Sequence, residues 1–284
     1  MNGIKRRFFG ILGRRLQGPK KGRKTIQLTL DKRQKFIIAV IALSIVLFIA
    51  QFQFGASGLL GPLILSVLTG IFLWWAIKGD MKSNANSSVF ILPFFYSLAF
   101  GLFYFLVPAR FLSRILLTGL YAFGLYSLFL SQNIFVVGSI RTIALLSGAR
   151  IVSFVITLVS FFLLTNIIFT FHLSIFPLIG VIFLFTYLLM YQSVWSYTLQ
   201  KTVVSLPLWI LALTICIVEV AVMLWFWPSN PTVIALFLTG IFYTVVGLSH
   251  VWFERRLFRG VLWEYLWVGV VVFFVLILFT SWGK

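Results

Sequence analysis

Apolar residues in this chain occur in blocks of about twenty, long enough for one helix to span the ~30 Å hydrocarbon core of a bilayer. The blocks show no period-two alternation, which argues against a membrane β-barrel. The pattern therefore predicts an all-α membrane protein with nine transmembrane helices. The expected spans are residues 36–54, 59–77, 89–107, 111–131, 150–171, 174–192, 203–227, 231–251 and 261–282.

A shorter apolar stretch at about 133–149 separates the fourth span from the fifth. It is interrupted by Gly138, Arg141 and Gly148, so we expect an interfacial or partly re-entrant helix there. The alternative is a tenth span. A tenth span would move the later cytoplasmic links to the outer side and remove the charge asymmetry described next.

Lys and Arg are distributed unevenly between the two sides of the predicted bundle. With the N-terminus inside and nine alternating spans, twenty of the 23 Lys and Arg fall on the inner side. The three on the outer side are Arg110, Arg114 and Lys284. Because cytoplasmic links carry an excess of Lys and Arg, this predicts a multi-pass plasma-membrane protein with a cytoplasmic N-terminus and an external C-terminus.

The basic charge is concentrated in residues 1–35, which hold twelve Lys and Arg and one acid, Asp31. We expect a cytoplasmic tail at 1–35, partly disordered or lying on the membrane surface, and one polytopic transmembrane domain at 36–284. Such a tail binds anionic lipid headgroups, at about 1 kcal/mol per basic residue. Nothing in it resembles a folded nucleic-acid module, so the expected partners are the bilayer, anionic headgroups and an unidentified membrane protein.

Glu219 is the only acid that sits well inside an apolar block. A charge there costs at least ~2.5 kcal/mol, so an intramembrane acid indicates a site whose partner has to be found. Arg110 and Arg114 break the positive-inside pattern on the outer side, at a depth near that of Glu219. We therefore predict a contact between Glu219 and Arg114. It is either a site for a small polar or anionic solute, or a structural pair between helices, and a neutral Glu219 with one hydrogen bond is the third possibility.

Two further sets of residues lie on the predicted inner side. Arg141 and Arg150 are candidates for inner-leaflet headgroup contacts, or they extend from the membrane to lipid phosphates without a specific role. His250 and Glu254 have the i, i+4 spacing of a metal pair, with Glu264 as a possible third ligand. Two ligands are too few for a site, so no metal is expected.

The supply of catalytic groups is small: two His, one Cys (Cys216) and five acids in 284 residues. The sequence has no Walker loop, no dinucleotide glycine fingerprint, no HExxH and no GxSxG. We assign no catalytic residues and expect no cofactor. The leading interpretation is a non-enzymatic structural or accessory membrane component. A channel or carrier is the alternative, and a membrane-embedded enzyme acting on lipid is the third.

The segments SQNIFVVGSIRTIALL and FWPSNPTVIALFLTGIFYTVVG resemble an uncharacterised family of bacterial multi-span integral membrane proteins, a domain of unknown function. The resemblance covers most of the chain after the tail. It implies a polytopic membrane fold, and it implies no activity, cofactor or site residue.

Overall fold

A computed structural model describes residues 31–53, 60–79, 87–107, 110–138, 145–199, 206–253 and 258–280, and the side chains of all these except 50–53. Nearly all of the expected basic tail lies outside these ranges. Every regular element within them is helical, as the apolar blocks predict. The helices are α2 (Lys32–Gln53), α3 (Leu60–Ile77), the 3-10 helix η1 (Ser87–Phe90), α4 (Ile91–Leu106), α5 (Phe111–Gly138), α6 (Leu146–Thr170), α7 (Ile175–Thr198), α8 (Leu206–Trp225), α9 (Pro231–Phe253) and α10 (Arg259–Leu278).

Eight of these segments are long and apolar enough to cross a membrane, with η1 and α4 counted as one. They coincide with the second to ninth expected spans. The first expected span coincides with α2, a helix of 22 residues. The all-α class and the positions of eight apolar candidate spans are thus confirmed.

The prediction of a separate interfacial or re-entrant helix at about 133–149 is wrong. Residues 133–138 continue α5, which is 28 residues long, and residues 146–149 begin α6. The physical reason is burial: Phe135 is fully buried and its ring meets Trp195 of α7 edge-on, with centroids 6.5 Å apart. The apolar side chains past residue 131 therefore belong to the packed face of α5. Residues 139–144, Arg141 among them, lie outside the described ranges.

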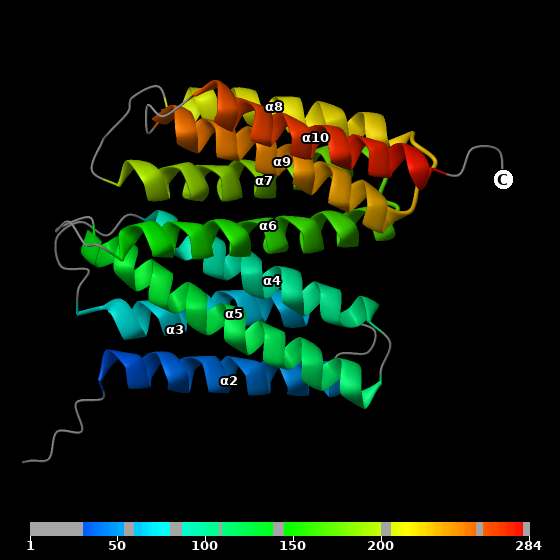
Figure 1. The fold of residues 1–284 in the computed structure, drawn as a ribbon. Helices are drawn as coiled ribbons and strands as arrows, with labels where there is room; N and C mark the ends of the chain where they lie inside the picture. The colour runs from blue at the N-terminus through cyan, green and yellow to red at the C-terminus, as the bar shows by residue number, and fades with distance from the viewer. Residues whose placement is uncertain are drawn as a thin grey trace, which may run out of the picture. The chain divides into compact units, whose positions relative to one another are not determined.

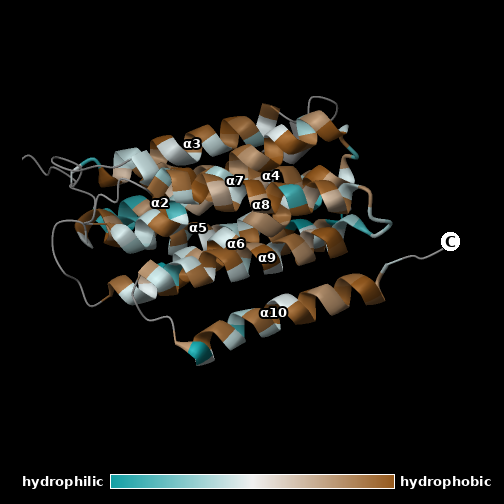
Figure 2. Ribbon diagram, turned by 90° about the horizontal axis from the view of Figure 1, so that it is seen from above, coloured by the Kyte–Doolittle hydropathy of each residue, from teal (hydrophilic) through white to brown (hydrophobic). Residues whose placement is uncertain are grey.

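The described helices lie side by side, with α6 near the middle (Figure 1). Helix α6 packs against α4, α5, α7 and α9, whereas α8 packs chiefly against α7 and α9. Helix α10 packs closely against α9, and Figure 2 shows it set apart from the other helices. The interior is therefore built around α6, while α8 and α10 expose much of their surface.

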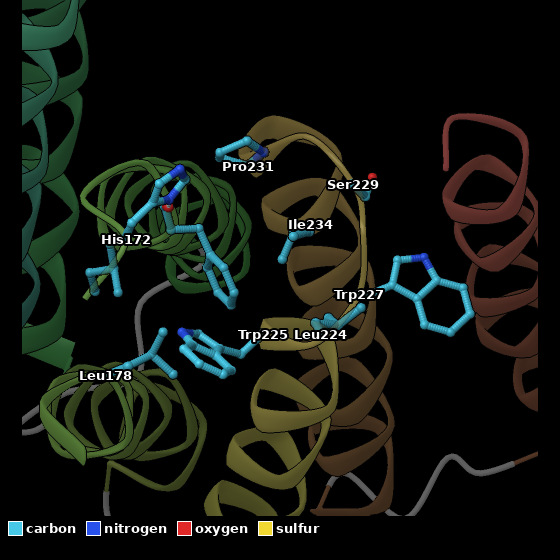
Figure 3. A pocket seen from close by; sticks show the side chains of 10 residues that line it. His172, Leu178, Leu224, Trp225, Trp227, Ser229, Pro231 and Ile234 are labelled. Carbon is cyan, nitrogen blue, oxygen red and sulfur yellow. Dashed lines mark hydrogen bonds between the residues drawn. The ribbon is translucent and has the colours of Figure 1, made fainter. Parts of the chain in front are cut away.

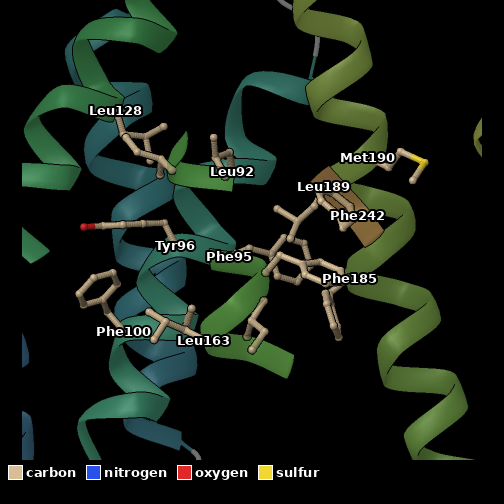
Figure 4. Packing of buried hydrophobic residues seen from close by; sticks show 14 of the residues in the cluster. Leu92, Phe95, Tyr96, Phe100, Leu128, Leu163, Phe185, Leu189, Met190 and Phe242 are labelled. Carbon is tan, nitrogen blue, oxygen red and sulfur yellow. The ribbon is translucent and has the colours of Figure 1, made fainter. Parts of the chain in front are cut away.

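The interior is filled by large aromatic and aliphatic side chains from several helices (Figure 4). Phe161 of α6 stacks on Phe242 of α9 at 4.3 Å and meets Phe185 of α7 at 5.4 Å. Lipid is as apolar as these side chains, so close packing rather than hydrophobic burial holds membrane helices together. Gly101 of α4 shows how close the contact is, because a Cβ there would lie 2.9 Å from Cβ of Pro62 on α3.

Candidate functional site

Three residues from three helices form a partly buried polar cluster where α6 begins and where α7 and α9 end. Tyr197 of α7 stacks on His250 of α9, with ring centroids 3.8 Å apart and planes 16° from parallel. The Arg150 guanidinium of α6 lies 4.8 Å from the centroid of the same tyrosine ring. The tyrosine thus contacts an imidazole and a cation, an arrangement that joins three helices through one ring.

Arg150 also donates hydrogen bonds to the end of α7. Its Nε and Nη2 donate to the carbonyl oxygens of Ser196 and Tyr197, each at 3.1 Å. The last carbonyls of a helix have no partner within the helix and carry partial negative charge, so a guanidinium is a favourable cap. Arg150 of α6 thus caps the C-terminal end of α7. The predicted headgroup contact of Arg150 stays a prediction.

His250 is buried, with 4% of its surface exposed, and its Nε2 lies 3.2 Å from Oγ of Ser193 on α7. The ring of Phe154 meets the imidazole edge-on at 5.2 Å. Among the described residues no three His, Cys, Asp or Glu side chains are grouped to hold a metal. Glu264 is exposed on α10, and Glu254 lies outside the described residues.

The contact between Ser193 and His250 pairs a hydroxyl with a base, as in nucleophilic enzymes. Ser193 is 3% exposed and His250 4%. Neither residue lines the cavity at the ends of α6 and α8 or the apolar groove beside Trp209 and Trp252. A substrate would have to reach the hydroxyl through packed side chains. The pair is therefore explained best as a hydrogen bond between α7 and α9.

A second polar chain joins α3, α4 and α5. Ser97 Oγ lies 2.7 Å from Oγ1 of Thr69 and 3.0 Å from the hydroxyl of Tyr121. Thr69 Oγ1 in turn donates to the carbonyl oxygen of Leu65 at 2.8 Å. All three residues that bear these hydroxyl groups are fully buried, so the chain of hydrogen bonds is an interior contact between helices. Sequence reasoning missed this chain.

Glu219 lies on the exposed surface of α8, and Arg114 is half-buried near the start of α5. Helix α5 packs chiefly against α2, α4 and α6, and α8 against α7 and α9. Helices α5 and α8 are thus not a closely packed pair among the described elements. Arg110 is exposed just before α5. The contact between Glu219 and Arg114 stays a prediction.

A cavity of about 270 Å³ lies where α6 ends and α8 joins α9 (Figure 3). Its lining includes His172, Trp225 and Ser229, with apolar side chains from α6 to α9. His172 has a left-handed backbone, φ 47°, and its Nδ1 lies 2.8 Å from the carbonyl oxygen of Phe169, a local bond of the kind that makes this conformation tolerable. Trp225 Nε1 donates to the carbonyl oxygen of Leu173 at 3.1 Å. The cavity is mainly apolar with a few polar groups.

Eight helical segments that are long and apolar enough to cross a membrane indicate a multi-span α-helical membrane protein. Residues 35–279 match the family model described as "Protein of unknown function (DUF5656)", so the chain belongs to that family. No curated protein and no solved structure matches the chain. This match confirms the predicted resemblance to a domain of unknown function over most of the chain.

Proposed function

We propose that the protein is a non-enzymatic structural or accessory component of a bacterial plasma membrane. It has nine spans, with α2 as the first, a cytoplasmic N-terminus and an external C-terminus. The asymmetry of Lys and Arg, twenty inside against three outside, supports this orientation. The basic tail at 1–35 then lies on the cytoplasmic side, next to anionic headgroups.

A structural role is supported by the partners of the polar side chains inside the bundle, which lie on neighbouring helices. Arg150 binds the end of α7, Ser193 contacts His250, and Ser97 links Thr69 to Tyr121. In a membrane such contacts hold helices together, at roughly 0.6 kcal/mol on average and up to ~1.7. In a structural component, polar side chains are expected to hold helices together and not to line a pathway for a solute.

One observation favours the alternative of a carrier for a small polar or anionic solute at Glu219 and Arg114. Tyr104 Oη on α4 and Thr118 Oγ1 on α5 are buried without a hydrogen-bond partner among the described residues. Thr118 is one helical turn from Arg114, so polar groups gather near that arginine. One observation argues against a carrier: the cavity where α6 ends and α8 joins α9 is lined by neither Glu219 nor Arg114.

Solute flux distinguishes the two proposals. The purified protein is reconstituted into phospholipid vesicles, and their shrinkage in chloride, phosphate and glycerol gradients is followed by light scattering. A structural component leaves the permeability equal to that of protein-free vesicles. Faster flux of one of these solutes that is lost in both Glu219→Gln and Arg114→Gln would overturn the structural proposal and establish the carrier.

A further inference from the structure

Glu219 lies on the side of α8 that faces away from the other helices. The buried residues of α8 are Leu206, Ile210, Thr214, Ile217, Val218, Ala221 and Leu224. At 3.6 residues per turn these share one side, and Glu219 lies about 170° from its centre. Helix α8 also lies along the upper edge of the assembly in Figure 1, with α7 and α9 as its main neighbours. Its outer side is thus turned toward lipid.

The depth of Glu219 makes this placement costly. It is six residues before the last residue of α8, about 9 Å along the helix from the outer end. Lipid tails offer no hydrogen bond, so an acid inside a span is unfavourable, by roughly 2.5–3.5 kcal/mol at the centre and by less toward the ends. Among the described residues no ion pair or hydrogen bond involves the Glu219 side chain. A polar group from outside the chain would remove this cost.

A second copy of this chain supplies such a group at the required depth. All copies insert in the same direction, so their Glu219 side chains lie at equal depth whichever side the N-terminus occupies. A two-fold axis along the membrane normal places the two carboxyl groups opposite each other. Two carboxyls in contact cannot both be ionised, but one can donate its proton to the other as a hydrogen bond. The group is therefore complementary to itself.

The exposed side of α8 also has the spacing of a helix–helix seam. Leu208, Ala212, Ile215 and Glu219 of α8 are all exposed, and their separations of four, three and four follow the heptad repeat. Ala212 is small enough for two helices to approach closely one heptad from Glu219. A single polar residue in an otherwise apolar seam is the device that fixes register and partner number in coiled coils.

We propose that the chain forms a homodimer through the outer side of α8, with Glu219 hydrogen-bonded to Glu219 of the second copy. This inference requires that the chain spans the membrane, as proposed above. It does not require the structural role, because a carrier can also be dimeric.

Disulfide trapping in native membranes tests the dimer. The single native cysteine is removed by Cys216→Ser, and Ala212→Cys places a thiol on the seam of the full-length chain. The matched control is Leu266→Cys in the same background. Leu266 is 42% exposed on α10, and it lies seven residues into its helix where Ala212 lies six into α8. Oxidation with copper–phenanthroline is followed by non-reducing electrophoresis.

The dimer predicts a covalent band of twice the chain mass from Ala212→Cys and at least fivefold less from Leu266→Cys. Adding Glu219→Leu should reduce the Ala212→Cys band severalfold, whereas Glu219→Gln should keep it because an amide also pairs with itself. Equal bands at both positions, no effect of Glu219→Leu, or crosslinks only to a different protein would overturn the proposal. Resistance to carbonate extraction, measured on the same variants, separates a membrane-embedded monomer from a chain that fails to insert.

Discussion

Tyr197 and His250 stack face to face across the contact between α7 and α9, with centroids 3.8 Å apart. Arg150 covers the same tyrosine ring from α6, so one aromatic side chain joins three spans. The residues are far apart in sequence, and the helices bring them together. The cluster links three helices and is therefore a suitable place to probe stability.

His250 should matter more to stability through its ring than through its hydrogen bond. His250→Ala removes the stacking on Tyr197 and the edge contact with Phe154, so we expect a loss of roughly 2–3 kcal/mol in the free energy of unfolding. Ser193→Ala removes one hydrogen bond and should cost about 1 kcal/mol. Thermal unfolding of the purified variants in detergent measures both. A larger loss in Ser193→Ala than in His250→Ala would contradict the assignment.

Gly247 sets the contact between α9 and α10. A Cβ at this position would collide with the ring of Tyr265 on α10. We expect Gly247→Ala to cost about 1–3 kcal/mol and to loosen α10, because α9 is its close neighbour. Hydrogen exchange of residues 259–278 follows the loosening.

The matched control is Gly180→Ala on α7, where an added Cβ meets nothing within 4 Å. This variant should leave exchange in α10 unchanged and raise stability by up to about 1 kcal/mol through helix propensity. Similar exchange in α10 for both variants would show that Gly247 is not a contact residue.

Ser97 and Tyr121 should be coupled. Each single variant, Ser97→Ala and Tyr121→Phe, breaks the 3.0 Å hydrogen bond between their hydroxyl groups. The double variant should therefore lose less than the sum of the two single losses, by about 0.5–1.5 kcal/mol. Unfolding of the four proteins of this cycle gives the coupling energy. Strict additivity would mean that the hydroxyls act independently.

Much of the fold could be predicted because membrane spans are recorded in the length of apolar blocks. The end of α7 shows the limit of that reasoning. The polar run from Gln192 to Thr198 indicates a link, yet the helix continues through it. Its hydroxyls bond back to the helix: Ser196 Oγ donates to the carbonyl oxygen of Ser193, and Thr198 Oγ1 to that of Val194.

The candidate sites were harder to predict because partners across helices leave no trace in sequence spacing. Arg150 and His250 were each singled out, but as a headgroup contact and as a metal ligand. Their common neighbour Tyr197 was missed, although its helical spacing of four from Ser193 was a usable signal. Hydropathy places residues at a depth, and only the packing of α6, α7 and α9 decides which residues at one depth meet.

Cysteine labelling directly tests the proposed orientation of the spans, with the N-terminus inside and the C-terminus outside. In a Cys216→Ser background, Asn230→Cys lies in the exposed link between α8 and α9, and Ser83→Cys lies between the second and third expected spans. A membrane-impermeant maleimide added to intact cells should label Asn230→Cys, and Ser83→Cys only after the membrane is permeabilised. Labelling of Ser83→Cys in intact cells, with Asn230→Cys protected, would contradict the proposed orientation.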